Sequence, residues 1–310
     1  MRWLLIILIG FCAPSYGVVA PRVNVEVSAI DETGEPLEGV HVTGTFYGIT
    51  DFETDTALTD SRGLANVGGG SFFPVGILAE KAGYYWSGAK VSTRDVVEGR
   101  EHYSDRQVTV VLKEKRNPIP LYAKRYSGEI PVAEKWVGFD LEKADWVAPH
   151  GRGMSSDFEF WFRGKIENMD SGEGELRLRL RERDGIVGVT EISGQSQLKV
   201  THIAPSDGYV HEEKVWRAAI RKKVEGRPVK SRFHFLRLRT SVDSKNEIVT
   251  ANYAKLYGDV FFSLVGRKGG FSRLQFTYYF NPMPNDRNLE FDPRRNLFMN
   301  LTHDEQVHEP

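Results

Sequence analysis

Apolar and polar residues alternate along much of the first third of the chain. Val23, Val25 and Val27 are separated by polar residues, which is the period of a strand with one buried face. Further short runs with apolar residues facing inward follow at residues 40–46, 64–67, 75–81 and 108–112. The pattern therefore predicts several short strands in this region.

Turn residues separate these runs. Asp31, Gly34 and Pro36 combine a side chain that can bond its own backbone, a residue free to take positive φ, and a residue with fixed φ. Residues 59–63 form a second turn, and the three glycines at 68–70 are expected to be a flexible break. Short strands with regularly spaced turns are typical of an antiparallel sandwich or barrel.

The same residues carry a family resemblance. The matching segments are Asp31, residues 34–40, Thr59 and Asp60 with Gly63, and residues 79–84. In these segments the first third of the chain resembles the carboxypeptidase-regulatory-like domains, also called transthyretin-like or prealbumin-like domains. The resemblance implies an Ig-like β-sandwich at residues 22–114, with an accessory or adhesive role in a secreted bacterial protein. It implies no reaction.

A second set of alternating runs begins after residue 150. The apolar residues that share a face are Phe158, Phe160 and Phe162; Leu176, Leu178 and Leu180; Ala254, Leu256, Val260, Phe262 and Leu264; and Leu274, Phe276, Tyr278 and Phe280. Phe233 and Phe235 have one parity and Leu236 and Leu238 the other, which predicts a β-bulge near residues 235–236. Residues 214–222 fit a strand or a helix equally well.

The chain is accordingly expected to be all-β: the N-terminal sandwich is followed by a larger antiparallel β-sandwich-like domain at residues 151–298. Pro118 and Pro120 mark a proline-containing connector at 115–150, whose aromatic residues are expected to form a strap over the second domain. An aromatic platform for a ligand is the alternative for Trp136, Phe139 and Trp146. The polar end, residues 299–310, is expected to be frayed.

Residues 1–17 have the pattern of a signal peptide. Arg2 is a short basic region, residues 3–11 an apolar core, and residues 15–17 a cleavage site of small residues. An uncleaved membrane anchor and a lipoprotein signal at Cys12 are the alternatives. The prediction is a protein that is secreted, periplasmic or at the cell surface, with no transmembrane anchor after cleavage. Because Cys12 is the only cysteine, the mature chain would form no disulfide.

Composition and motifs exclude several functions. The formal net charge of −1 gives no general attraction to nucleic acid. Ser196 lacks the second glycine of a nucleophile elbow, and His211 lacks the second histidine of a zinc-protease motif. The polar cluster at 285–292 does not have the spacing of a calcium loop and is interpreted as a turn. No cofactor and no metal are predicted, and no catalytic residue is assigned.

One candidate binding surface is a row of arginines. If Leu176, Leu178 and Leu180 are buried, the intervening arginines must face the other way. The row comprises Arg177, Arg179, Arg181 and Arg183, with Arg237 and Arg239 as candidate neighbours. Guanidinium groups in a row would suit a polyanion such as an acidic glycan. The alternative is a solvated sheet face with cross-strand partners such as Glu159 or Glu182.

A second candidate surface is aromatic. Tyr253 and Tyr257, with Phe261, lie opposite the inward set of their strand and could stack on sugar rings. The alternative is a strand that is buried on both faces.

These features favour a non-catalytic structural or ligand-binding protein of the cell envelope, with a carbohydrate or another envelope protein as its partner. The alternative is a secreted hydrolase acting on polysaccharide or peptide, in which the first domain is accessory. Whether the chain is an enzyme stays open, because a working pair of carboxylates cannot be identified from spacing alone.

Overall fold

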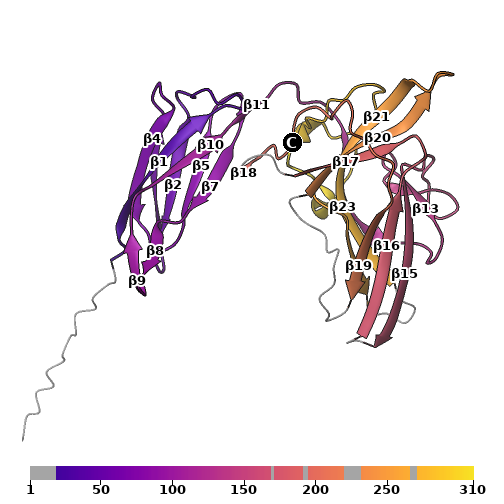
Figure 1. Ribbon diagram of the computed structural model, residues 1–310, viewed down its shortest axis with the longest axis horizontal. Coiled ribbons are helices and arrows are strands. Elements are labelled where there is room, and N and C mark those ends of the chain that lie inside the picture. The colour runs from indigo at the N-terminus through magenta and orange to yellow at the C-terminus, as the bar shows by residue number, and fades with distance from the viewer. Residues whose placement is uncertain (1–18, 169–170, 191–194, 220–231, 266–270) are drawn as a thin grey trace, which may run out of the picture. The chain divides into compact units, whose positions relative to one another are not determined.

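The computed structural model describes residues 19–168, 171–190, 195–219, 232–265 and 271–310. The predicted signal peptide, with Cys12, lies outside the described residues. The chain divides into two compact units (Figure 1): Met1–Lys81 with Gly88–Val110, and Ala82–Ser87 with Val111–Pro310. Nearly all regular structure is β, so the predicted all-β class is confirmed. No helix in the described ranges is long and apolar enough to cross a membrane.

The first unit is a small antiparallel sandwich. One sheet has the order β10 (Arg106–Val111), β1 (Arg22–Ile30), β4 (Leu64–Gly70). The facing sheet runs β7 (Ser87–Val91), β5 (Val75–Glu80), β2 (His41–Tyr47), β3 (Phe52–Leu58), and β8 (Arg94–Val97) forms a hairpin with β9 (Arg100–Tyr103). The predicted inward residues of β1 and β2 are buried, among them Val25, Val42 and Phe46.

The turn chemistry of the first unit is as the sequence predicts. The Asp31 carboxylate accepts hydrogen bonds from the backbone N–H groups of Thr33 and Glu35, and Gly34 has φ +90°. Asp60 does the same for Arg62 and Leu64, and Gly63 has φ +74°.

The glycine run is not the flexible break that its composition suggests. It is the end of β4, and its backbone N–H groups at Gly68 and Gly70 donate to Asp55 and Glu53. A Cβ on Gly69 would lie 2.5 Å from the Phe46 ring, so close packing of the two sheets requires glycine there.

The second unit is a larger sandwich with a third layer. One sheet has the order β12 (Tyr122–Glu129), β23 (Phe271–Asn281), β21 (Ile248–Leu256), β20 (Arg232–Val242), β17 (Gly185–Thr190), and β22 (Phe261–Val265) also pairs with β23. The facing sheet runs β14 (Asp145–Trp146), β13 (Val137–Asp140), β15 (Phe158–Asn168), β16 (Ser171–Arg179), β19 (Lys214–Ala219). The remaining elements are β6 (Tyr84–Tyr85), which pairs with β11 (Lys113–Glu114), β18 (Gln195–Ser196), and the short 3-10 helices η1 (Pro293–Arg295) and η2 (His303–Glu305).

The larger sheet is buried on both faces. Its inner face packs on the smaller sheet through residues such as Leu236, Ala254 and Phe276. Its outer face carries a second core that includes Phe235 and Tyr253 and is covered by non-strand segments: Val200, Ala204, Leu289, Phe291 and Val307 contribute to that cover.

This third layer corrects the β-bulge prediction. Phe233 and Phe235 enter the second core, whereas Leu236 and Leu238 enter the main core, so the change of parity reflects burial on both faces of β20. The irregularity in register lies further along, between Leu238 and Ser241.

Two predicted boundaries are also corrected, and one segment that the sequence left open is assigned. Residues 115–150 are not a separate connector and strap, because they supply β12, β13 and β14 to the two sheets of the second unit. The apolar set from Ala254 to Leu264 spans two strands, β21 and β22, separated by a turn at Gly258 with φ +85°. The ambiguous segment is the strand β19 over residues 214–219, and residues 220–222 lie outside the described ranges.

The end of the chain is anchored rather than frayed. Val307 is buried, the Tyr279 hydroxyl donates to the Glu309 carbonyl at 3.0 Å, and Lys255 Nζ donates to the Pro310 carbonyl at 3.1 Å. Main-chain carbonyls accept the hydrogen bonds that fix this segment to the larger sheet. For that reason the polar side chains of the segment did not reveal that it packs there.

Candidate functional site

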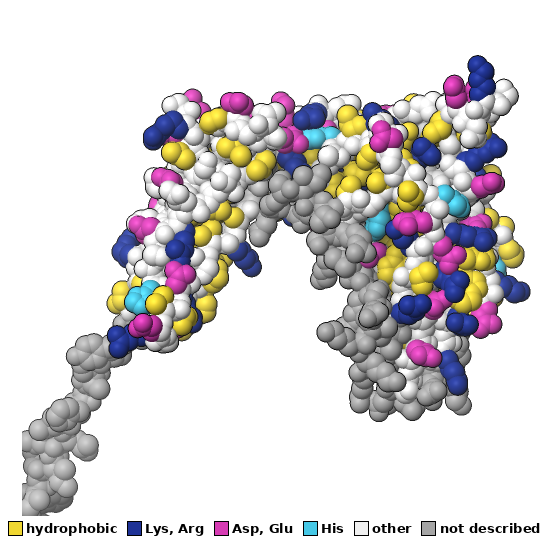
Figure 2. Space-filling model, in the orientation of Figure 1, with side chains coloured by type: hydrophobic (Ala, Val, Ile, Leu, Met, Phe, Trp, Pro, Cys, Tyr) yellow, Lys and Arg dark blue, Asp and Glu magenta, His cyan; other side chains and the backbone are white. Residues whose placement is uncertain are grey.

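The most distinctive exposed surface is the solvent face of the smaller sheet in the second unit. We call it the arginine–tryptophan face and define it by Trp136, Glu159, Trp161, Arg163, Glu175, Arg177 and Arg179. Leu176 and Leu178 of β16 are buried in the main core, so Arg177 and Arg179 are forced outward, as the alternation predicts. Figure 2 shows basic, acidic and hydrophobic side chains interspersed where Figure 1 draws β15 and β16.

Antiparallel pairing of β15 with β16 fixes the order of groups on this face. Glu159 lies opposite Arg179, Trp161 opposite Arg177, and Arg163 opposite Glu175. Arg179 Nε donates to Glu159 at 2.6 Å, and Arg177 Nε donates to Glu175 at 2.6 Å. The hydrogen bond from Arg177 lowers the pKa of Glu175, so this carboxyl stays ionised.

Each described tryptophan of the face has a guanidinium group beside its ring. The Cζ atom of Arg179 lies 4.1 Å from the ring centroid of Trp136, and that of Arg177 lies 4.9 Å from the centroid of Trp161. Arg163 approaches Trp161 from the neighbouring position, at 5.6 Å. Both indoles are partly exposed. The result is a rigid row of flat groups, aromatic and polar in turn.

The structure does not assemble the other predicted site residues here. β16 ends at Arg179, so Arg181 and Arg183 lie beyond the strand, in an exposed turn. Arg237 lies over the Tyr209 ring at 5.1 Å, and Arg239 is directed into a buried cluster. The arginine row is therefore two residues long on the sheet, and both have carboxylate partners.

The predicted aromatic row is mostly core. Tyr253 is buried against the second core and Tyr257 packs partly buried against it, with its ring 5.0 Å from that of Phe233. Phe261 is exposed but belongs to the next strand, β22. Neither tyrosine presents an open ring face of the kind that a sugar platform requires.

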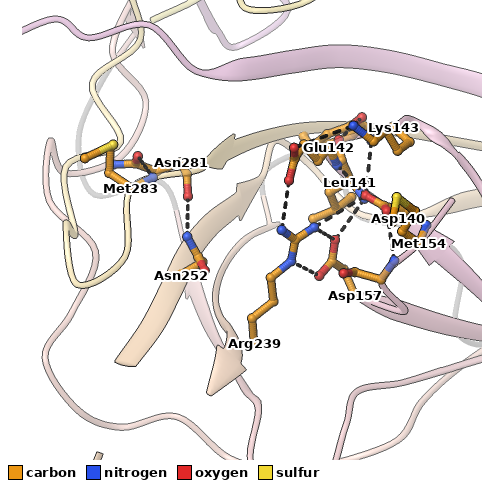
Figure 3. Close-up of polar contacts among 12 residues, drawn as sticks. Asp140, Leu141, Glu142, Lys143, Met154, Asp157, Arg239, Asn252, Asn281 and Met283 are labelled. Carbon is orange, nitrogen blue, oxygen red and sulfur yellow. Dashed lines mark hydrogen bonds and ion pairs between the residues drawn. The ribbon is translucent and has the colours of Figure 1, made fainter. Parts of the chain in front are cut away.

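Sequence reasoning missed a buried cluster around Arg239 (Figure 3), which we call the Arg239 cluster: Arg239, Asp140, Glu142 and Asp157. Arg239 Nε and Nη2 donate to the two oxygens of Asp157 at 2.9 and 3.0 Å, and Nη1 donates to Glu142 at 2.9 Å. Arg239 has φ +51° at the irregularity in β20, which turns its side chain toward these carboxylates. Its guanidinium also lies 4.6 Å from the Phe280 ring centroid.

The carboxylates of this cluster are already saturated. Asp140 accepts backbone N–H bonds from Glu142, Lys143, Met154 and Ser155. Burial opposes ionisation of Asp140, but these donors together hold its pKa below the ordinary value. Burial raises the pKa of Asp157, although Arg239 acts in the opposite direction. With both oxygens of Asp140 and of Asp157 engaged, the cluster organises loops rather than presenting a free buried acid or base.

No group of three or more His, Cys, Asp or Glu side chains in the described ranges is placed to hold a metal ion.

Comparison with known proteins does not assign a family. No protein-family model and no curated protein matches the chain. Among solved structures, a chlorocatechol 1,2-dioxygenase from Pseudomonas putida has a TM-score of 0.24 at 10% identity, over 31% of this chain and 61% of the enzyme. A DUF3823 family protein from Parabacteroides merdae scores 0.23 at 6% identity, over 71% and 91% of the two chains. The major pilin SpaA of Corynebacterium diphtheriae scores 0.21 at 9% identity, over 77% and 70%.

The chain thus spans less than two thirds of the length of the dioxygenase. Likeness at these scores carries no inference about function, so function has to be argued from the geometry of the chain itself.

Proposed function

We propose that this protein is a non-catalytic binding protein of the cell envelope or the extracellular space, and that its arginine–tryptophan face binds carbohydrate. The observation that carries the proposal is the alternation of Trp136, Arg179, Glu159, Trp161 and Arg177 on one exposed sheet. The C–H groups of a pyranose ring pack against the flat face of an indole. Guanidinium and carboxylate groups beside the indoles supply donors and acceptors for hydroxyls.

The charges of the face favour a neutral glycan over a polyanion. Glu159 and Glu175 neutralise Arg179 and Arg177 at hydrogen-bonding distance, so the three arginines and two glutamates of the face leave only a small positive charge for an acidic polymer. Ion pairs at the surface are weak and exchange readily with solvent. Sugar hydroxyls could therefore replace water around these pairs without separating them.

The position of most of these groups on paired strands also supports a binding role. Cross-strand pairing holds Trp161, Arg177 and Arg179 in fixed order, and Trp136 directly precedes β13, so little conformational entropy is lost when a flat ligand binds. The saturation of the Arg239 cluster supports a non-catalytic reading of the unit. An export route, as the N-terminal sequence indicates, would bring the face into contact with glycans.

The test is to titrate the protein with linear neutral oligosaccharides built from glucose, mannose or N-acetylglucosamine and to measure binding by calorimetry. Trp161→Ala and Arg179→Gln should each weaken binding by about tenfold or more, because central aromatic and arginine contacts dominate small interfaces. Trp86→Ala is the matched control, since Trp86 is 40% exposed and does not belong to this face. If the wild type and the Trp161 variant bind the oligosaccharide with equal affinity, the arginine–tryptophan face is not the binding site.

A further inference from the structure

A hollow of about 360 Å³ in the second unit, lined by residues outside the arginine–tryptophan face, has the make-up of a separate ligand site. The side chains and backbone that surround it are those of Tyr85, Lys115, Pro118, Gln197, Phe291, Asp292, Pro293, Arg294 and Pro310. This volume is at the lower end of the range for small-molecule sites, which fits one or two sugar rings.

A buried glutamate makes the floor of the hollow rigid. Glu290 is 1% exposed and accepts hydrogen bonds from the Tyr85 hydroxyl at 2.8 Å and from the backbone N–H groups of Arg116 and Asn117 at 3.0 and 2.7 Å. On either side of the fully buried Phe291, the Ile119 N–H donates to the Glu290 carbonyl and the Asp292 N–H donates to the Ile119 carbonyl. The floor is thus preformed, and the Glu290 charge is satisfied within the protein rather than directed into the hollow.

The rim of the hollow is cationic. Lys115 and Arg294 are both exposed, and within the described ranges neither forms an ion pair with a carboxylate. Lys115 Nζ lies 5.4 Å from the Tyr85 ring centroid. The one acidic residue of the lining, Asp292, accepts from Arg295 Nε at 2.7 Å and from the Arg294 backbone N–H at 3.0 Å, so its charge is engaged by a residue outside the lining.

The remaining rim groups suit a compact ring. The rings of Pro118 and Pro293 are apolar and rigid, and the partly exposed Gln197 places an amide among them. At the far end, Pro310 is held by the hydrogen bond from Lys255 to its carbonyl. Two cations, one engaged carboxylate, an amide and small apolar surfaces line one hollow.

We infer that this hollow binds a carboxylate carried on a sugar ring, that is, a uronic acid unit. Lys115 and Arg294 bind the carboxylate, Gln197 binds a ring hydroxyl, and the two prolines contact the ring C–H groups. A free carboxylate on a peptide shares part of this chemistry and can bond Gln197 through its own amide groups, but it offers no ring of C–H groups to the two prolines. The inference goes beyond the proposed function, because it concerns a different surface and a charged ligand.

The experiment compares methyl β-D-glucuronide with methyl β-D-glucoside. The two differ only at C6, which is a carboxylate in the glucuronide and a hydroxymethyl group in the glucoside. Binding is followed by amide chemical shifts in the full chain. The glucuronide should bind at least tenfold more tightly and shift the signals of residues 115, 197 and 291–294, because charge-assisted hydrogen bonds are the stronger kind. The double variant Lys115→Gln and Arg294→Gln should abolish the preference. Arg152→Gln, at a fully solvated arginine outside the lining, should retain it.

Three results would overturn the inference: no binding of the glucuronide, equal binding of the glucoside, or a preference that survives in the double variant. N-acetylglycine serves as a peptide carboxylate, and binding as tight as that of the glucuronide would overturn the assignment to a sugar. The variants leave Trp136 and Trp161 untouched, so failure here is distinguishable from failure of the neutral-glycan proposal.

Discussion

The Arg239 cluster and the arginine–tryptophan face of the second unit both pair guanidinium groups with carboxylates, but they differ in burial. Arg239 lies against Asp157, whose side chain is fully buried, whereas Arg179 lies against Glu159 at a surface where both side chains are substantially exposed. Removing a partner from a buried pair leaves a charge without solvent, but removing one from an exposed pair leaves a charge that water can satisfy. Burial therefore distinguishes the structural role of the Arg239 cluster from the role in recognition that we propose for the arginine–tryptophan face.

The largest expected effect is from Arg239→Met. The change leaves Asp157 buried without its bidentate partner and should lower the free energy of unfolding by about 3–5 kcal/mol, measured by urea denaturation. The double variant Arg239→Met and Asp157→Leu should lose less than the sum of the two single changes, because the buried charge is removed together with its partner. A loss below about 1 kcal/mol for Arg239→Met would contradict the contrast between the clusters.

The buried Lys255 should show a different signature. Burial lowers the pKa of Lys255 from its ordinary value of 10.5 to about 7; the Glu290 charge acts in the opposite direction and that of Lys113 adds to the lowering. Unfolding then takes up a proton between these two pH values, so stability should rise with pH across that window and not below it.

The measurement is the free energy of unfolding from pH 7 to pH 9.5 for the wild type and Lys255→Met. The wild type should gain up to about 1.4 kcal/mol per pH unit relative to the variant within the window. Parallel pH profiles for the two proteins would show that Lys255 keeps its proton in the fold.

The smallest expected effects are on the exposed face. Arg177→Gln and Arg179→Gln should each change the free energy of unfolding by about 0–1 kcal/mol, because exposed ion pairs contribute little to stability. Thermal unfolding of both variants beside Arg239→Met tests this directly. A loss of unfolding free energy as large as that of the Arg239 variant would mean that the ion pairs of the face are needed to stabilise the fold.

The alternation in the sequence was sufficient to predict the class of fold and the outward position of Arg177 and Arg179. It could not reveal the third layer over the larger sheet, because the covering residues, such as Leu289 and Val307, lie in irregular segments with no period to detect. For this reason Tyr253 and Tyr257 looked like a surface row. A strand covered on both faces has the same local pattern as a strand with one aromatic face exposed.

The Arg239 cluster was hidden for another reason. Its carboxylates come from β13 and from the segment before β15, far from β20 in the sequence, and the left-handed backbone at Arg239 that joins them leaves no local signal. The sequence could not join the two tryptophans of the face into one surface, because Trp136 precedes β13 and meets Arg179 only once β13 pairs with β15.

The central claim is that the arginine–tryptophan face is the surface that binds ligand. Its most direct test is to follow the indole N–H signals of the tryptophans while a neutral oligosaccharide that binds in the calorimetric screen is added. We expect the signals of Trp136 and Trp161 to shift together along one binding curve, while those of the buried Trp146 and Trp216 and of the exposed Trp86 stay in place. Saturable binding that shifts other tryptophans, or none of them, would contradict it.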